Sequence, residues 1–213
     1  KSLVPLKNNG DEEPLFFVHP ISGTVNRYTD LAAKMPVNVP VFGIQAITDL
    51  LEEYSSIAAI AEIYVAAIRT VQPQGPYRLA GWSLGGTIAL EIAQQLRNQG
   101  EEISMLTLID SFLYDSSIED DLRVDLVGFV HELTSYNGGE IESSWVEDED
   151  LDKDIDTLIE QAKQHLLDSG LFNAETVVQE FAQRWHNYQL FNAAWKEYSA
   201  EFYDDKHHLF MAS

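Results

Sequence analysis

Apolar and polar residues are grouped along the first half of the chain in a way that predicts strands and helices in alternation. Apolar runs bounded by turn residues predict strands over 15–18, 37–44, 77–80 and 103–109. Between them, apolar residues recur at three- and four-residue spacing, which predicts helices over 28–34, 55–70 and 87–97. Because strands and helices alternate, the pattern predicts a parallel α/β sheet with helices packed on it.

After residue 110 the pattern changes, and helical spacing continues without an intervening strand. It predicts helices over 121–136, 151–168 and 174–198, and then a short strand over 207–212. The apolar stripes of these helices are explained if the helices pack on one another and on the sheet. They are also explained by a lid that covers the strand ends and shapes an apolar substrate chamber. Both descriptions can hold at once.

We therefore expect one domain with an internal insertion. Residues 13–113 would form its core, about 115–198 the helical insertion, and 199–213 a strand that returns to the sheet, while residues 1–12 resemble a linker. A chain of 213 residues, 45% of them apolar, is large enough to bury such a core.

The most informative stretch is Gly81-Trp82-Ser83-Leu84-Gly85-Gly86, which stands between a predicted strand and a predicted helix. It matches the G-x-S-x-G pattern of a nucleophile elbow, a sharp strand-to-helix turn with a serine at its apex. The flanking glycines suit a turn in which backbone segments approach too closely for a Cβ atom. The helix N-terminus beneath the serine favours developing negative charge. A turn with a purely structural role is the alternative.

Other polar residues follow the ends of neighbouring predicted strands. His19-Pro20-Ile21 comes directly after one strand, Ser83 after another and Asp110 after a third. In parallel sheets, ligands bind at the carboxyl ends of the strands. We therefore expect these residues at one edge of the sheet.

The charge of the chain narrows the classes of partner. The 13 Lys and Arg residues stand against 35 Asp and Glu, which gives a formal net charge of −22. A chain this acidic is unsuited to nucleic acid or to an anionic membrane surface. Acidic residues are densest between 115 and 156, which indicates either a solvated surface segment or a patch that docks a basic partner.

The chain contains no cysteine, which excludes disulfide bonds and thiolate metal sites, and no spacing of His, Asp and Glu indicates another metal site. No apolar run is long enough to cross a bilayer. The first residues lack the apolar core and cleavage site of a signal peptide. We expect a cytoplasmic protein without a bound metal.

Several segments around the elbow point to one family. They are Gly75–Gly86, Phe16–Pro20, Gly43–Ala46, Leu108–Ser111 and Leu3–Leu6. With these residues the chain resembles, over nearly its whole length, the type I thioesterase domains at the C-terminal end of nonribosomal peptide and polyketide synthases. The resemblance implies an α/β-hydrolase fold, a mostly parallel sheet flanked by helices with a helical lid insertion. In that family, the segment that Leu3–Leu6 resembles links the domain to a preceding carrier domain.

The same resemblance implies the chemistry. Ser83 would attack an acyl thioester on the phosphopantetheine arm of an upstream carrier domain and form an acyl-enzyme. Asp110 would be the acidic member of the triad, which orients the histidine and stabilises the imidazolium. The backbone N–H groups of Ile21 and Leu84 would form the oxyanion hole. His19 would be a structural residue, and the domain itself would bind no cofactor.

The catalytic histidine is harder to assign. The α/β-hydrolase order of triad residues is Ser, Asp, His, so the base must follow Asp110. The histidines in that region are His131, His165, His186, His207 and His208. The first three fall in the predicted insertion. Leu209-Phe210-Met211-Ala212 resembles the family's strand that precedes the histidine loop, so we expect the base outside the given sequence. His208, which echoes an H-x-x-M motif, is the alternative.

We therefore expect a thioesterase that releases a peptidyl or polyketide chain by hydrolysis or macrocyclisation. The alternatives are a discrete editing thioesterase, a generic esterase, and a non-catalytic carrier-docking module that lacks the base. Good turnover of small oxygen esters would indicate the esterase. A histidine in the sequence beyond Ser213 would exclude the docking module.

Overall fold

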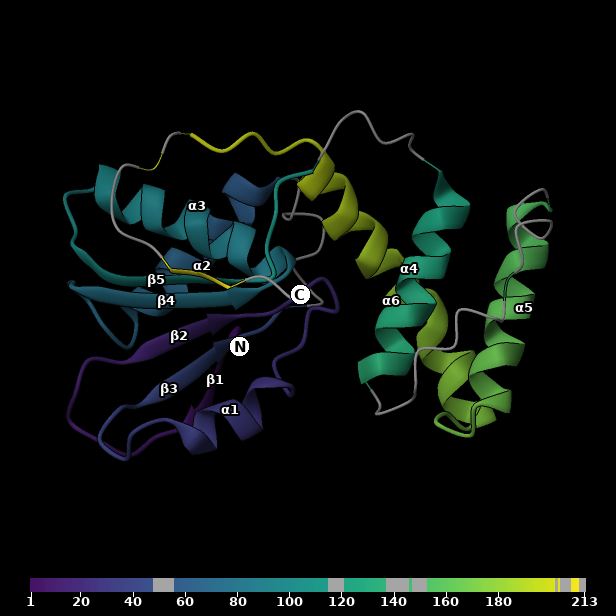
Figure 1. Cartoon of the computed structure of the whole chain (residues 1–213), viewed down its shortest axis with the longest axis horizontal. Helices are drawn as coiled ribbons and strands as arrows, with labels where there is room; N and C mark the ends of the chain where they lie inside the picture. The colour runs from purple at the N-terminus through teal and green to yellow at the C-terminus, as the bar shows by residue number, and fades with distance from the viewer. Residues whose placement is uncertain are drawn as a thin grey trace. The chain divides into compact units, whose positions relative to one another are not determined.

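The computed structural model describes residues 1–47, 56–114, 121–136, 146, 153–201, 203 and 208–210 (Figure 1). The chain forms two compact units. One comprises Lys1–Asp115 together with Leu190–Ser213 and contains the sheet; the other comprises Ser116–Gln189 and is helical. We call them the sheet unit and the helical unit. Within the described residues, no helix combines the length and apolar character needed to cross a membrane.

The described residues of the sheet unit form a mixed sheet of six strands in the order β1-β3-β2-β4-β5-β6. The strands are β1 (Leu3–Lys7), β2 (Leu15–Val18), β3 (Val41–Ile44), β4 (Tyr77–Trp82), β5 (Ile103–Ile109) and β6 (His208–Phe210). Strands β2 to β6 run parallel to one another, and only β1, which pairs with β3 among the described strands, is antiparallel. The mostly parallel sheet expected from the sequence is confirmed.

Two segments differ from the sequence-based expectation near the N-terminus. Leu3–Lys7, expected within a linker, forms the edge strand β1. Pro5 interrupts its apolar pattern, and a proline is tolerated at a sheet edge because its missing N–H breaks no central ladder. Strand β3 begins only at Val41 rather than at Val37. Pro40 cannot donate to a ladder, and Val37 is 78% exposed.

Helices cover both faces of the sheet. Helices α2 (Ile57–Arg69) and α3 (Leu84–Asn98) lie on one face, and α1 (Tyr28–Lys34) lies on the other (Figure 1). Successive residues of β2 enter opposite cores: Phe16 and Val18 pack with α2 and α3, whereas Leu15 and Phe17 pack with α1. A strand buried on both faces explains why Leu15–Val18 is apolar throughout.

The helical unit has its own core. It contains α4 (Leu122–Tyr136), α5 (Ile155–Asp168) and most of α6 (Ala174–Lys196). Phe129 of α4 contacts Phe181 and Trp185 of α6, with ring centroids 5.4 and 5.2 Å apart. Residues 190–198, which the sequence placed in the insertion, cluster with the sheet unit, because Phe191 and Ala194 are buried in its core.

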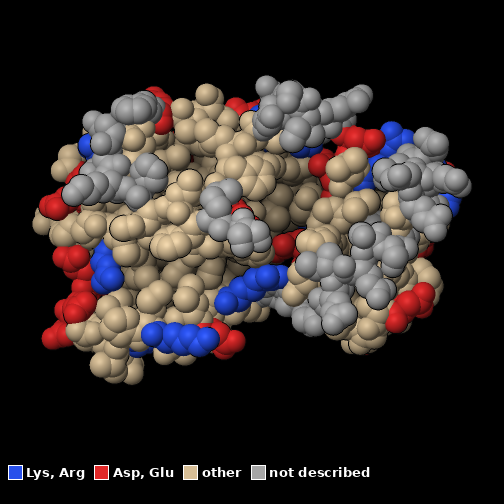
Figure 2. Space-filling model, viewed as in Figure 1, with Lys and Arg blue, Asp and Glu red and all other residues tan. Residues whose placement is uncertain are grey.

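Most of the acidic residues between 115 and 156 lie outside the part of the chain that the structure describes. On the face drawn in Figure 2, the acidic side chains of the sheet unit lie mainly along its margin. The middle of this face of the sheet unit shows few charged side chains. The idea that this segment docks a basic partner therefore stays a prediction.

Candidate active site

Ser83 is the single residue between strand β4 and helix α3. Its backbone has φ 55° and ψ −128°, a conformation that costs free energy for any residue with a side chain. Two hydrogen bonds hold this turn: Ser83 N–H donates to Ile109 O at 2.9 Å, and Gly86 N–H donates to Ser83 O at 3.0 Å. The half-buried serine is thereby fixed at the carboxyl end of β4.

Glycines flank the serine because backbone segments meet there. A Cβ atom at Gly81 would lie 2.1 Å from the Gly85 carbonyl oxygen. A Cβ atom at Gly85 would lie 2.4 Å from the carbonyl oxygen of Val18 and 2.6 Å from that of His19. The first turn of α3 therefore packs directly on the ends of β4 and β2, as the G-x-S-x-G pattern predicts.

We expect Gly85→Ala to lower the free energy of unfolding by about 3 kcal/mol, because the new methyl group meets backbone that cannot move aside. The matched control is Gly100→Ala. Gly100 has φ +85° but open space around a Cβ, so only backbone strain of about 1 kcal/mol is added. Urea unfolding of both variants measures the difference. Equal losses would contradict the close packing at Gly85.

Asp110 occupies the equivalent place on the neighbouring strand. Trp82 of β4 pairs with Ile109 of β5, so Ser83 and Asp110 are the next residues on two adjacent parallel strands. Asp110 also has a positive φ, 47°, which aspartate tolerates better than most residues. Its N–H donates to the carbonyl oxygen of Phe210 at the end of β6. The structure thus brings a serine and a carboxylate together at one edge of the sheet.

Two backbone amides predicted to bind an oxyanion belong to neighbouring segments. Leu84 is the first residue of α3, where amides have no acceptor within the helix. Ile21 lies in the turn after β2, which Gly23 N–H closes by donating to Pro20 O at 2.9 Å. The approach of Gly85 to the His19 carbonyl brings the start of α3 against this turn.

His19 is fully buried, as a structural residue would be. Its Nδ1 lies 2.6 Å from the Pro20 carbonyl oxygen, and its Nε2 lies 2.6 Å from the Tyr64 hydroxyl. Burial lowers the pKa of His19 from 6.5 to about 4, although the hydrogen bond to Pro20 opposes the shift. The sequence gives no signal for this role of Tyr64, because the residue stands among apolar residues on the buried face of α2.

The other histidines are distributed as follows. His131, His165 and His186 belong to the helical unit, and His207 lies outside the described residues. His208 pairs with Thr107, and Phe210 pairs with Ile109. His208 therefore stands within the ladder rather than at the carboxyl edge where Ser83 and Asp110 lie. Among the described residues, no three His, Asp or Glu side chains are grouped so that they could hold a metal ion.

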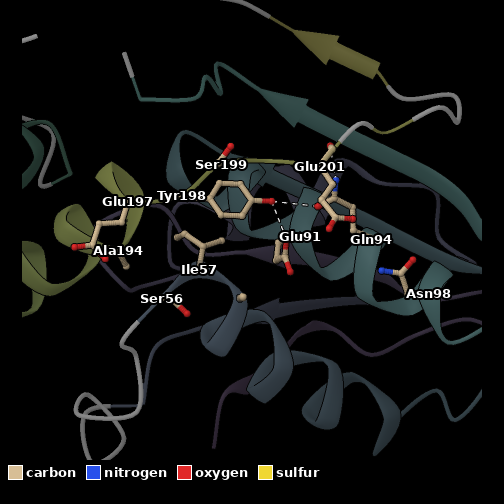
Figure 3. Close-up of a pocket in the computed structure, with 11 residues that line it drawn as sticks. Ser56, Ile57, Glu91, Gln94, Asn98, Ala194, Glu197, Tyr198, Ser199 and Glu201 are labelled. Atoms are coloured by element: carbon tan, nitrogen blue, oxygen red, sulfur yellow. Dashed lines mark hydrogen bonds between the residues drawn. The ribbon is translucent and has the colours of Figure 1, made fainter. Parts of the chain in front are cut away.

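A cavity of about 370 Å³ opens elsewhere in the sheet unit, between α2, α3 and the chain that follows α6 (Figure 3). Tyr198 donates a hydrogen bond to Glu91 at 2.8 Å within it. Burial, together with this bond, raises the pKa of the Tyr198 phenol. Glu91 is the first α3 residue of the lining, about 10 Å along the helix from Leu84. This cavity is therefore separate from the serine and the carboxylate.

Comparison with known sequences identifies similar proteins. A family profile described as "Thioesterase domain" matches residues 13–207. The chain is 44% identical over 112 residues to a dimodular nonribosomal peptide synthase of Bacillus subtilis strain 168, covering 52% of this chain and 5% of that protein. It is 46% identical over 99 residues to the non-reducing polyketide synthase crz7 of Cladonia metacorallifera, covering 46% of this chain and 5% of that protein.

Comparison with solved structures gives matches of similar kind. One match is holo-AB3403, a four-domain nonribosomal peptide synthetase, with a TM-score of 0.84 and 25% identity. The alignment covers 99% of this chain and 16% of the synthetase chain. Another match is the NocB thioesterase domain, with a TM-score of 0.71 and 24% identity. The alignment covers 98% of this chain and 77% of the NocB chain, and at this identity it supports the fold alone. The matched regions make up 1–5% of the first curated relatives.

Proposed function

Because the chain belongs to the thioesterase domain family, we propose that it releases a peptidyl or polyketide chain from the phosphopantetheine thioester of an upstream carrier domain. The observation that carries this proposal is the position of Ser83 in a strained elbow beside Asp110, at the ends of adjacent parallel strands. Phosphopantetheine enters as part of the carrier-bound substrate, so the domain needs no resident cofactor.

In the proposed reaction, the Ser83 hydroxyl oxygen attacks the thioester carbonyl carbon while a histidine takes the hydroxyl proton. The N–H groups of Ile21 and Leu84 stabilise the oxygen anion of the tetrahedral intermediate. The intermediate collapses, the C–S bond breaks, and the pantetheine thiol leaves with the proton from the histidine. Water, or an amine or hydroxyl of the acyl chain, then attacks the acyl-serine. The first gives hydrolysis and the second macrocyclisation.

We place the catalytic histidine in the polypeptide after β6. Asp110 N–H donates to the carbonyl oxygen of Phe210, so the last described residue of β6 lies beside Asp110. A histidine that follows β6 would therefore start near Asp110, whereas His208 stands two residues earlier in the ladder. The helical unit would act as the lid that excludes water and folds the acyl chain.

The test is to incubate the chain with a short acyl pantetheine thioester and measure its intact mass, with Ser83→Ala as the control. We expect a Ser83-dependent acyl adduct in a chain that extends beyond Ser213. An adduct on the present 213 residues would make His208 the base instead. If neither chain forms an adduct, Ser83 is not a nucleophile, and the alternative of a non-catalytic carrier-docking module holds.

A further inference from the structure

The peptide group between Pro20 and Ile21 is held by the hydrogen bond of its turn and also by the His19 side chain. The Pro20 carbonyl oxygen accepts from Gly23 N–H at 2.9 Å, and His19 Nδ1 lies 2.6 Å from the same oxygen. This carbonyl belongs to the same peptide plane as the N–H of Ile21, since a peptide group is planar. Fixing the oxygen from one side therefore fixes the direction in which the Ile21 N–H points.

The contacts of His19 determine which nitrogen carries the proton. A carbonyl oxygen can only accept, so Nδ1 must be the donor to Pro20. In the neutral ring Nε2 is then an acceptor, and the Tyr64 hydroxyl, 2.6 Å away, supplies the proton for that bond. Tyr64 thereby holds the histidine in the one tautomer that can donate to the Pro20 carbonyl.

The surroundings leave the imidazole little freedom. The ring is 5.0 Å from the Phe191 ring and 5.6 Å from the Tyr64 ring, measured between centroids. Both His19 and Tyr64 are fully buried. Burying two polar side chains costs free energy unless their hydrogen bonds are made, and an apolar pair would fill the same space without that requirement. Here both hydrogen bonds are made, so the buried pair is satisfied and the imidazole is held in one position.

We propose that His19 and Tyr64 are positioning residues for the oxyanion hole: Tyr64 sets the tautomer of His19, and His19 aims the Ile21 N–H at the developing oxyanion. Neither side chain touches the substrate. This inference rests on the proposed function, because it assigns the Ile21 amide to the oxyanion of that reaction. It deepens that function by extending the oxyanion site into helix α2, which carries Tyr64.

The variant that tests it is Tyr64→Phe, which keeps the ring and removes only the hydroxyl. Tyr77→Phe is the matched control, since Tyr77 is equally buried and donates to Gln72 O at 3.1 Å, at the opposite end of β4. Both variants keep the ring and lose the hydrogen bonds of the hydroxyl, which for Tyr77 are its bond to Gln72 O and its contact with Arg69. In the chain that forms the acyl adduct, we expect Tyr64→Phe to lower kcat about tenfold to a hundredfold with KM within about twofold. The Tyr77 variant should keep the wild-type kcat.

A double variant separates positioning from stability. His19→Leu combined with Tyr64→Phe leaves no polar group of the pair unsatisfied, so much of the stability lost in Tyr64→Phe should return. The kcat should stay low, because nothing then holds the Pro20 carbonyl beyond its own turn. Recovery of kcat together with stability would overturn the proposal, as would equal losses of kcat in the two tyrosine variants.

A readout without catalysis keeps this inference distinct from the proposed function. Hydrogen exchange of the Gly23 amide, measured by NMR on the present chain, reports how firmly the Pro20 carbonyl is held. We expect about tenfold faster exchange in Tyr64→Phe and no change in Tyr77→Phe. Unchanged exchange in Tyr64→Phe overturns the pairing whatever the activity. If no Ser83 adduct forms, the proposed function is overturned. The exchange rate of the Gly23 amide then still decides whether His19 and Tyr64 hold the Pro20 carbonyl in place.

Discussion

Asp110→Asn should lower kcat/KM for an acyl thioester by about a thousandfold or more, in the chain that forms the Ser83 adduct. The carboxylate would hold the catalytic histidine in the correct tautomer and stabilise its positive charge, and an amide does neither; such a change typically costs 10³–10⁴. The variant should fold, because asparagine has the same shape and also tolerates the positive φ at this position.

Steady-state kinetics with an acyl pantetheine thioester measure this loss. Ser111→Ala is the matched control: Ser111 is the next residue, is buried, and uses its hydroxyl to bond the Ile109 carbonyl oxygen at 3.0 Å. Its loss should lower stability slightly and leave kcat within about twofold. If Asp110→Asn also stays within about tenfold of the wild type, the carboxylate is not the triad acid.

The stability of the sheet unit should fall as the pH is lowered from 6.5 to 4, by about 3 kcal/mol from His19 alone. The folded protein keeps His19 neutral down to a pKa of about 4, whereas the unfolded chain binds the proton at its ordinary pKa of 6.5. Between these pH values the unfolded state binds more protons, so the free energy of unfolding decreases with falling pH. Above 6.5 both forms are neutral and below 4 both are protonated, so the contribution is constant outside this window. A pKa difference of about 2.5 corresponds to this energy.

Urea unfolding at several pH values, for the wild type and His19→Gln, isolates this contribution. The chain carries 35 carboxylates whose titration also changes stability, but both proteins share them. The difference between the two curves should therefore narrow by about 3 kcal/mol as the pH falls through this window. Curves that remain parallel from pH 7 to pH 4 would show that His19 is not kept neutral by burial.

Local features of the fold were predictable because neighbouring residues determine them. Ser56 caps α2 by accepting from Ala59 N–H at 3.1 Å, and a serine directly before an apolar helical run is a local signal for such a start. The turn at Ser83 needs glycine on both sides, and the G-x-S-x-G pattern contains both of these glycines. Asp110 directly follows an apolar run, so its place at a strand end was also predictable.

Features that depend on distant partners were not predictable in the same way. Leu3–Lys7 becomes a strand only because β3 offers it an edge. Residues 190–198 continue a helical pattern without interruption, but Phe191 packs in the core of the sheet unit, so the boundary between units falls inside α6. Hydrophobic periodicity predicts that one face of a helix is buried, but it does not predict which other element that face packs against.

The sequence by itself determined the alternation of strands and helices, the serine elbow and the acidic residue on a following strand, because spacing and glycine chemistry act over a few residues. Only the tertiary structure decided that Ser83 and Asp110 are side by side, since strand order and register depend on pairing across the whole chain. It also decided that Tyr64, 45 positions from His19, bonds its ring. The partner of a hydroxyl on an apolar helix face cannot be predicted from the sequence, because only tertiary packing brings the two groups together.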